Sequence, residues 1–237
     1  MNGDFTDRHV VVTGGAGALG GAVVELLLET GAMCHVPCFD RAEYDGFPFT
    51  SHDRVRAVAG VDLAKEEACE SFFAEPPDLW ASIHIAGGFA MAPIAETSLA
   101  NWRRMMDMNA TSCFLSCREA VRKMRASDTG EGTGGRIVNV AARPALAPAG
   151  GMIAYTTSKA AVASITQCLA EELKSEGIWV NAVVPSIMDT PANREAMPDA
   201  DHASWASVED VARTIVFLAS PDNRVSSGGL VPVYGRS

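Results

Sequence analysis

The 237-residue sequence has little of the positive charge that nucleic-acid and membrane-surface proteins carry. Its 19 Lys and Arg residues are outnumbered by 29 Asp and Glu residues, so the formal net charge is -10. Binding to nucleic acid or to an anionic membrane requires clustered Lys and Arg to neutralise phosphates. The sequence also lacks an uninterrupted apolar run long enough to cross a bilayer. We therefore expect a small-molecule substrate as the partner, with neither nucleic acid nor membrane involved.

Signals for export and for metal binding are also missing. The first residues lack the basic start and apolar stretch of a secretion signal, which favours a cytoplasmic location. The six cysteines show no zinc-binding spacing. Cys113 and Cys117 lie one helical turn apart, but no nearby segment offers the further ligands that a metal needs. We expect no metal site, and we interpret these thiols as small buried hydrophobic side chains.

The sequence does contain alternating strand-like and helix-like segments. Strands are predicted near 9–12, 33–39, 55–61, 82–85, 136–140, 178–184 and 230–233, and helices near 22–30, 65–74, 98–125, 151–176 and 208–218. No good helix fits between residues 41 and 53, where Gly46 and Pro48 interrupt the pattern. The alternation predicts one α/β domain over residues 1–237, with a Rossmann-type doubly wound parallel sheet and helices on both faces.

A glycine-rich turn, TGGAGALG from Thr13 to Gly20, joins the first strand to the first helix. Glycines let the backbone approach a pyrophosphate, and the N–H groups and dipole of the helix start favour its negative charge. Tight packing of a strand on a helix without any ligand is the alternative explanation. As a dinucleotide site, the turn supplies the candidate cofactor-binding residues Gly14, Gly17, Ala18, Leu19 and Gly20.

Two carboxylates follow strands where a dinucleotide would lie. Asp62 could accept a hydrogen bond from an adenine amino group, or it could cap the following helix. At the end of the second strand, Asp40 could bind ribose hydroxyls whereas Arg41 could bind a 2′-phosphate. The cofactor is therefore NAD(H) or NADP(H), and the absence of Lys or Arg from the glycine-rich turn leans slightly to NAD(H).

Tyr155 and Lys159 lie four residues apart on a predicted helix, so their side chains share one face. A phenol is a poor acid–base group at neutral pH, and an adjacent ammonium group lowers its pKa. The pair can therefore exchange a proton with a substrate. The alternative is that the two residues merely share a helix surface.

Taken in order, these features resemble the short-chain dehydrogenase/reductase superfamily. The resemblance runs from Val10 to Gly235, and it rests on Thr13 to Gly20, Ala86-Gly87, Asn109, Asn139-Val140, Tyr155-x-x-x-Lys159, Asn181 and Pro185. It implies an NAD(P)-dependent oxidoreductase in which the nicotinamide carries a hydride, Tyr155 supplies the proton, Lys159 also contacts the nicotinamide ribose, and Asn109 holds a relay water.

The same resemblance implies further cofactor contacts, a substrate lid and an oligomer. The additional cofactor-binding residues are Ala86, Gly87, Tyr155, Lys159, Pro185, Ile187 and Thr190. A short lid is expected over about 188–206. The long helices at 98–125 and 151–176 match those that the family packs into homodimers and homotetramers.

The sequence departs from the family pattern at the residue that usually bonds the substrate oxygen. Ala142 stands thirteen residues before Tyr155, where the family has serine, and Ala18 and His84-Ile85 also differ from the pattern. These departures resemble the dihydropteridine reductase branch, which implies a conjugated imine or carbonyl substrate, such as a quinonoid dihydropteridine. The alternatives are a general ketone or alcohol dehydrogenase, and a catalytically impaired nucleotide-binding regulatory protein.

Overall fold

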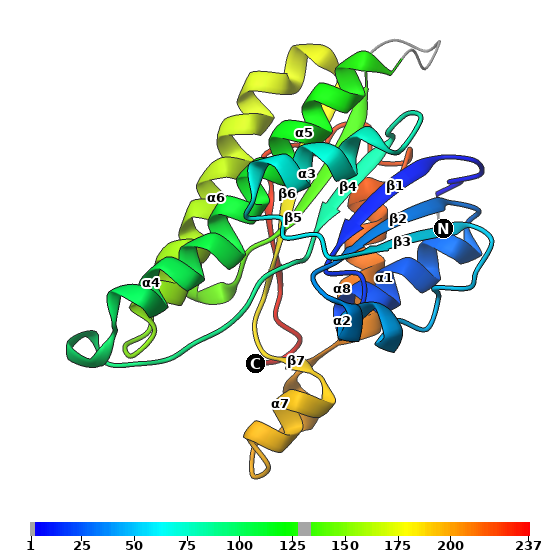
Figure 1. Cartoon of the computed structure of the whole chain (residues 1–237). Coiled ribbons are helices and arrows are strands. Elements are labelled where there is room, and N and C mark those ends of the chain that lie inside the picture. Colours follow the sequence, from blue (N-terminus) through cyan, green and yellow to red (C-terminus); the bar gives the residue numbers. More distant parts are fainter. Residues whose placement is uncertain (1–2, 128–133) are drawn as a thin grey trace.

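A seven-stranded parallel sheet forms the centre of the computed structural model, which describes residues 3–127 and 134–237. The strand order β3-β2-β1-β4-β5-β6-β9 confirms the predicted Rossmann-type doubly wound sheet (Figure 1). The strands are β1 (His9–Thr13), β2 (Met33–Cys38), β3 (Val55–Ala59), β4 (Ala81–His84), β5 (Gly135–Val140), β6 (Ile178–Pro185) and β9 (Leu230–Val233). A separate two-stranded sheet pairs β7 (Met188–Asp189) with β8 (Ala206–Ser207).

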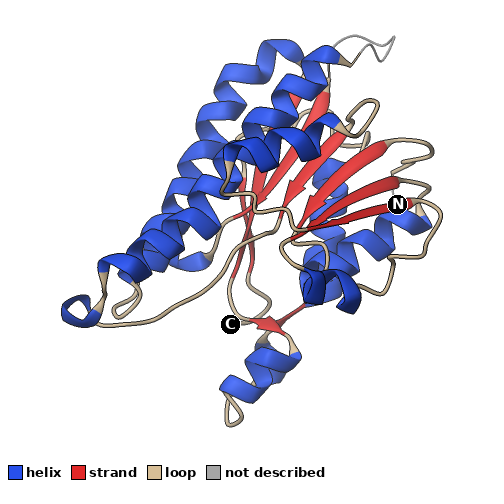
Figure 2. Cartoon of the chain, in the orientation of Figure 1, coloured by secondary structure: helices blue, strands red, loops and turns tan. Residues whose placement is uncertain are grey.

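Helices cover both faces of the large sheet (Figure 2). The α-helices are α1 (Ala18–Glu29), α2 (Arg41–Gly46), α3 (Glu66–Ala74), α4 (Leu99–Met105), α5 (Ser112–Ala126), α6 (Ile153–Leu173), α7 (Pro191–Ala196) and α8 (Val208–Ala219). Short 3-10 turns span Ile94–Glu96, Arg143–Ala145, Lys174–Glu176 and His202–Ser204. Helix α1 packs against α8 on one face, whereas α3, α5 and α6 lie on the other. None of the described helices is long and apolar enough to cross a membrane.

Strand β1 shows why this sheet needs helices on both sides. Val10 and Val12 pack into the core beneath α1 and α8, whereas Val11 packs into the core beneath α3 and α5. Successive side chains of a strand point to opposite faces, so a run of valines buries both faces at once. All three valines have no exposed surface.

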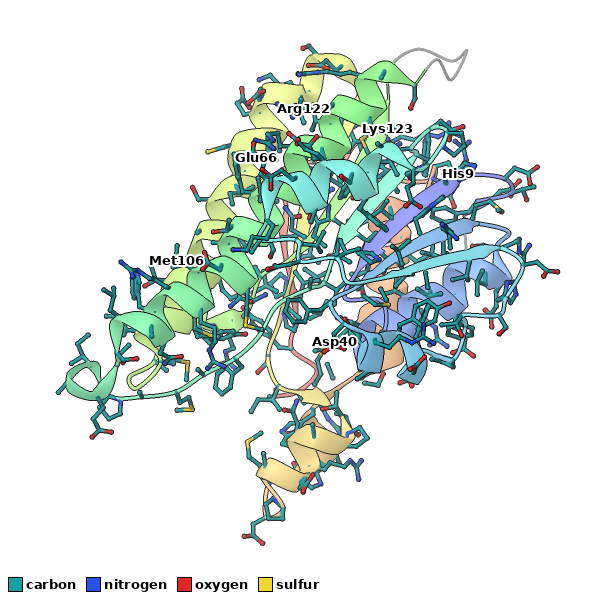
Figure 3. The ribbon with its side chains drawn as sticks, viewed as in Figure 1. His9, Asp40, Glu66, Met106, Arg122 and Lys123 are labelled. Carbon is teal, nitrogen blue, oxygen red and sulfur yellow. The ribbon has the colours of Figure 1, made fainter. Side chains whose placement is uncertain are left out.

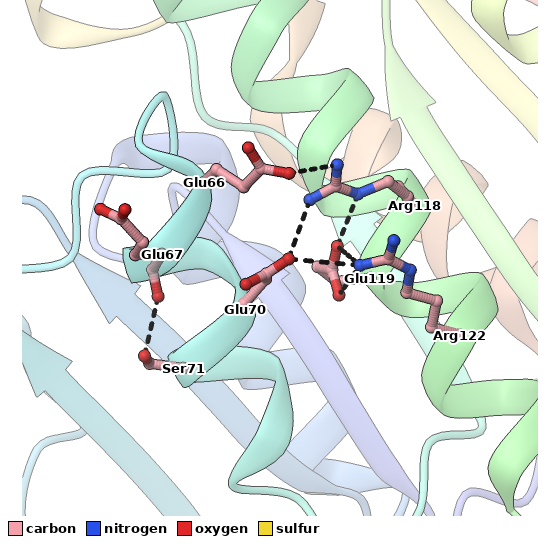
Figure 4. A network of polar contacts seen from close by, with 7 residues as sticks. All are labelled: Glu66, Glu67, Glu70, Ser71, Arg118, Glu119 and Arg122. Carbon is pink, nitrogen blue, oxygen red and sulfur yellow. Dashed lines mark hydrogen bonds and ion pairs between the residues drawn. The ribbon is translucent and has the colours of Figure 1, made fainter.

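Charged side chains hold helix α3 against helix α5 (Figure 4). Arg118 pairs with Glu66 at 2.6 Å and with Glu119 at 2.7 Å. Glu70 lies 3.3 Å from Arg122 and 3.4 Å from Arg118, so the contacts form a network rather than isolated pairs. Isolated surface pairs contribute at most about 1 kcal/mol each, and a network of this kind mainly fixes the alignment of the two helices.

The segment between β2 and β3 is partly helical, so the expectation of no helix between 41 and 53 is wrong. Asp40 caps α2 by accepting a hydrogen bond from the Glu43 backbone N–H at 2.8 Å. Arg41 and Asp45 form an ion pair at 2.8 Å across one turn. A cap and a favourable pair of this kind stabilise a helix too short for a periodic apolar pattern to reveal.

The long helix expected over 98–125 is interrupted. Ser98 caps α4 by accepting from the Asn101 N–H at 3.1 Å, and a π-helical turn over Met106–Thr111 separates α4 from α5. Helix α5 ends at Ala126, one residue beyond the expected end of the stretch. Asn109 lies inside this π-helical turn. Because π-helical turns recur at functional sites, this position agrees with its candidate role in the active site.

Because all neighbouring strands of the large sheet are parallel, their carboxyl ends meet at one edge. Asp40, which follows β2, lies at this edge, whereas His9 at the start of β1 lies at the opposite end (Figure 3). The loops at the carboxyl edge therefore carry the candidate site.

Candidate active site

A cavity of about 1100 Å³ opens at the carboxyl edge of the sheet. Most of the predicted cofactor-binding residues line it: Gly14, Gly17, Ala18, Leu19, Gly20, Asp40, Asp62, Ala86, Gly87 and Thr190. The lining does not include Tyr155, Lys159, Pro185 or Ile187. The cavity thus follows the expected path of a dinucleotide from the glycine-rich turn to the end of β4.

The glycine-rich turn has the backbone that a phosphate site requires. Gly14 adopts a left-handed conformation with φ of 66°, and a Cβ atom on Gly20 would lie 2.0 Å from the Gly14 carbonyl oxygen. Gly17 begins α1 without any side-chain cap, and the first turn of α1 contains no acidic residue. The first N–H groups of α1 are therefore available to an anion, as pyrophosphate binding requires.

The side chains of Asp40 and Arg41, which follow β2, make different contacts. The Asp40 carboxylate caps α2 and lines the cavity. Arg41 is exposed, pairs with Asp45, and places its guanidinium 4.9 Å from the centre of the Tyr44 ring. Of the two residues that could select the cofactor, Asp40 lines the cavity and Arg41 does not.

Asp62 does not cap helix α3. Its carboxylate accepts from the Ala64 N–H at 3.0 Å within the turn after β3, and α3 begins four residues later at Glu66. Asp62 lines the cavity. The helix-capping alternative is therefore wrong, while the contact with adenine stays a prediction.

Helix α6 places Tyr155 and Lys159 on successive turns. The buried Lys159 Nζ donates to the Val140 carbonyl oxygen at 2.8 Å, at the end of β5. The Tyr155 ring packs edge-on against Phe89, with ring centres 4.8 Å apart. Both side chains thus contact groups at the carboxyl edge of the sheet rather than merely sharing a helix surface.

Burial controls the pKa values of both groups. It raises the pKa of Tyr155 to about 12 and lowers the pKa of Lys159 to about 8. The expected lowering of the Tyr155 pKa by the ammonium group is therefore wrong for the free protein. The reason is the loss of hydration on burial, which leaves the phenol protonated and able to act as an acid.

Asn109 joins the π-helical turn to two neighbouring segments. Its Nδ2 donates to the Gly88 carbonyl oxygen and to the Ser158 Oγ, both at 3.0 Å, and its Oδ1 accepts from the Gly88 N–H at 3.0 Å. A Cβ atom on Gly87 would lie 2.4 Å from the Asn109 Oδ1 and 3.4 Å from the Lys159 Nζ. Asn109, Lys159 and Gly87 therefore meet beside the cavity.

Ala142 is buried at the end of β5, where it precedes the 3-10 turn Arg143–Ala145. Its methyl group cannot donate a hydrogen bond to a substrate oxygen. Pro185 is buried at the end of β6, and Ile187 is 37% exposed outside the cavity lining. Thr190 lines the cavity and caps α7 by accepting from the Asn193 N–H at 3.2 Å.

Several cavity residues escaped sequence reasoning. They are Phe39, Glu43, Lys65, Arg103 and Arg104, among others, whereas Asn193 belongs to the predicted lid. Phe39 is 64% exposed directly after β2, and a large apolar residue at the carboxyl end of a strand was a usable signal. Arg103 and Arg104 come from α4, and only the packing of that helix beside the cavity brings them close.

The structure also corrects the expectation that no further metal ligand lies near Cys113 and Cys117. His84, at the end of β4, has its Nδ1 3.4 Å from the Cys117 Sγ, and all three side chains are buried. His84 is far from the two cysteines in sequence, so this contact could not be predicted. It forms only when helix α5 packs on strand β4.

Comparison with known proteins agrees with the family resemblance found in the sequence. A family model described as short chain dehydrogenase matches residues 8–201. The chain is 31% identical to chanoclavine-I dehydrogenase of Claviceps purpurea, over 98% of this chain and 95% of that protein. It is 33% identical to galactitol 2-dehydrogenase of Rhizobium johnstonii, over 95% and 93% respectively. A solved short chain dehydrogenase/reductase family protein superimposes with a TM-score of 0.88 at 26% identity, covering 98% of this chain and 97% of that one.

Proposed function

We propose, because this chain belongs to the short-chain dehydrogenase family, that it transfers a hydride between NAD(P)(H) and a small carbonyl or imine substrate, with Tyr155 as the proton donor. The observation that carries this proposal is the meeting of Gly87, Asn109 and Lys159 beside the cavity. Hydride transfer needs acid–base groups close to the bound dinucleotide, and here they lie beside a cavity that contains a phosphate-binding turn.

The residues of the cavity fit a dinucleotide. The turn leads into the start of α1, whose first N–H groups have no side-chain cap, and Asp40 provides a carboxylate after β2. We propose that these groups hold the pyrophosphate and the adenosine ribose, and that Asp40 favours NAD(H). When bound, the nicotinamide supplies or accepts the hydride.

The side chains then have separate roles. The neutral Tyr155 phenol donates its proton to the substrate as the hydride arrives, and in the reverse direction the Tyr155 phenolate accepts the proton of the substrate hydroxyl. The Lys159 ammonium, held by the Val140 carbonyl oxygen, stabilises the phenolate that forms. Asn109 positions α6 through Ser158 and orders the loop at Gly88.

Two substrate classes have support. Ala142 supports an activated substrate, such as a conjugated imine or carbonyl, because such a substrate relies less on a serine hydroxyl at its oxygen. The relatives are named as dehydrogenases of chanoclavine-I and galactitol, which supports an alcohol and its carbonyl product instead. These relatives give no support to a place in the dihydropteridine reductase branch.

A spectrophotometric panel tests the function and separates the classes. Purified protein is mixed with NADH or NADPH and with simple ketones, diketones and a quinonoid dihydropterin, and NAD(P)+ is tested with sugar alcohols and steroid alcohols. We expect turnover in at least one arm, with a loss of about 100-fold or more in Tyr155→Phe. Tight dinucleotide binding without turnover in any arm would instead favour a nucleotide-binding regulatory protein.

We also propose that residues 1–237 act as one cytoplasmic domain that assembles into a homodimer or homotetramer, with residues 188–206 as a substrate lid. Leu99, Phe114 and Ile153 are large, exposed apolar residues on α4, α5 and α6, which supports helix-mediated assembly. Light scattering after size-exclusion chromatography measures the oligomeric state, and a monomer at micromolar concentration contradicts this assembly.

A further inference from the structure

Three potential metal ligands meet behind the candidate active site. They are His84 on β4, and Cys113 and Cys117 on the first turns of α5. One ligand atom from each residue lies within 4.8 Å of the others, and the three side chains are between 2% and 5% exposed. The proton-donating machinery described above uses none of them.

The local structure explains this meeting. Cys113 and Cys117 are one helical turn apart, so both lie on the same face of α5, and that face packs on the sheet. Ser82 and His84 alternate with Ile83 along β4 and therefore point to the same side. Helix α5 packs against β4, which brings the imidazole to the two thiols.

The spacing of the ligand atoms suits a tetrahedral ion. Zinc binds nitrogen at about 2.0 Å and sulfur at about 2.3 Å, so these atoms lie about 3.5 Å apart across a tetrahedral angle. The His84 Nδ1 and the Cys117 Sγ are 3.4 Å apart. The Asn139 Oδ1 forms hydrogen bonds with the same nitrogen at 2.8 Å and with the same sulfur at 3.6 Å, so this oxygen is close enough to act as a fourth ligand once both groups lose their protons.

The groups around these ligands hold them in orientations that favour an ion. The Ser82 Oγ lies 2.7 Å from the His84 Nε2, so it can accept a hydrogen bond from the Nε2–H while Nδ1 binds a metal. The Asn139 Nδ2 donates to the Thr166 Oγ1 at 2.9 Å, and that hydroxyl donates to the Val162 carbonyl oxygen at 2.8 Å. This chain of bonds orients the Asn139 side chain so that its oxygen faces the Cys117 sulfur.

Charge is consistent with a divalent ion at this depth. Two thiolates neutralise a divalent cation, so an occupied site adds no net charge beside the buried Lys159 ammonium. Thiolate and imidazole together select zinc over magnesium or calcium.

We propose that His84, Cys113, Cys117 and the side-chain oxygen of Asn139 bind one zinc ion that ties helix α5 to strand β4. The ion is structural, since four protein ligands leave no open position for a substrate. It stabilises the helix that follows Asn109 and the strand that leads to Gly87. The site does not depend on the substrate or on the cofactor.

Metal content and cobalt spectroscopy test the site. The full chain is produced in medium supplied with zinc(II) or cobalt(II), dialysed against a chelator, and analysed by elemental mass spectrometry and absorption. We expect about one ion per chain and a thiolate-to-cobalt charge-transfer band, both lost in Cys113→Ser and Cys117→Ser. Cys34→Ser, a buried thiol in the other core cluster, and the exposed Cys168→Ser should retain both signals.

Two results would overturn the site. One is wild-type protein without stoichiometric zinc or cobalt, and the other is metal content in Cys117→Ser equal to that of the wild type. If the cysteine variants do not fold, X-ray absorption of the zinc-loaded wild type shows which atoms bind the ion. Two sulfurs at about 2.3 Å with nitrogen and oxygen near 2.0 Å support the site, whereas a spectrum without sulfur contradicts it.

Discussion

Asn109 and Ser158 are joined by a 3.0 Å hydrogen bond from the Asn109 Nδ2 to the Ser158 Oγ. Ser158 in turn donates to the Tyr155 carbonyl oxygen at 2.7 Å and directly precedes Lys159. The bond therefore links the π-helical turn to the segment of α6 that carries both proposed acid–base residues. This link gives Asn109 a positioning role in addition to the relay role that its family resemblance implies.

Replacement of Asn109 by alanine should impair both stability and turnover. The backbone N–H and carbonyl of Gly88 and the Ser158 hydroxyl lose a partner, and each unsatisfied buried group costs about 1–3 kcal/mol. We expect kcat to fall about 10-fold or more, because small displacements of reacting groups are costly. Urea unfolding and steady-state kinetics measure the two effects.

Asn101→Ala is the matched control for this substitution. Asn101 lies on α4, where its Oδ1 accepts from the Arg104 Nη2 at 3.1 Å, and that bond is exposed. We expect a change in unfolding free energy within about 0.5 kcal/mol. If Asn109→Ala behaves like Asn101→Ala in kcat and in stability, Asn109 does not position α6.

Substitution by alanine should weaken cofactor binding at one glycine near the dinucleotide turn and leave it unchanged at the neighbouring glycine. A Cβ atom on Gly20 would lie 2.0 Å from the Gly14 carbonyl oxygen, whereas the nearest atom to a Cβ on Gly21 is 3.9 Å away. Gly20→Ala must shift the turn and should weaken cofactor binding at least about 10-fold. Gly21→Ala should leave binding unchanged and stabilise α1 by up to about 1 kcal/mol.

Nicotinamide fluorescence titration and urea unfolding separate the two glycine variants. Gly21→Ala reports the intrinsic effect of alanine in the same helix, so it corrects the Gly20→Ala result for helix propensity. Equal cofactor affinity in the two variants would rule out the proposed approach of the pyrophosphate to Gly20.

Asp40 should set the preference for NADH. In Asp40→Ser the hydroxyl can still cap α2, since serine is a good N-cap, but no carboxylate remains to bind ribose hydroxyls. We expect the KM for NADH to rise about 10-fold and the KM for NADPH to stay constant or fall. Asp45→Ser, which loses only the exposed pair with Arg41, is the control. A wild-type enzyme that prefers NADPH would contradict this role.

The phenol of Tyr155 predicts a pH dependence of stability. Burial raises its folded pKa to about 12, above the usual value near 10, so the folded protein holds this proton more tightly than the unfolded chain. The contribution of the phenol is therefore complete below pH 10 and is lost as the pH rises through 12. Unfolding free energies of wild type and Tyr155→Phe should converge or cross between these limits.

Urea unfolding at pH 8, 10 and 11 measures that difference. The buried thiols of Cys34, Cys38 and Cys69 also have raised pKa values, but they are present in both proteins and cancel. A difference that stays constant from pH 8 to pH 11 would show that the phenol is not desolvated.

The sequence predicted those parts of the site that depend on local pattern. The turn after β1 and the pair on α6 are each contained in one short segment, and their positions in the structure follow from that segment's own backbone. The α2 helix, the π-helical turn around Asn109 and the approach of His84 to Cys117 could not be predicted in this way. They arise from a local cap or from packing between elements far apart in sequence.

Ala142 offers the sharpest test of the substrate class. Ala142→Ser restores a hydroxyl at the end of β5, in the position where the resemblance to the family places a donor to the substrate oxygen. A donor at a developing oxyanion contributes up to about 100-fold in rate, so we expect kcat/KM for simple ketones to rise toward that limit. Turnover of a conjugated imine should change little, because less charge develops on an oxygen there.

Ala145→Ser is the control for this change, since it adds the same hydroxyl to the 3-10 turn three residues later. We expect it to leave kcat/KM for every substrate within about 2-fold of the wild type. Parallel assays with a ketone and a quinonoid dihydropterin then compare the two variants. A gain on ketones confined to Ala142→Ser means that the native enzyme relies on substrates that are already activated. No gain on ketones, with intact folding and cofactor affinity, means that another group already bonds the substrate oxygen and favours an ordinary alcohol dehydrogenase.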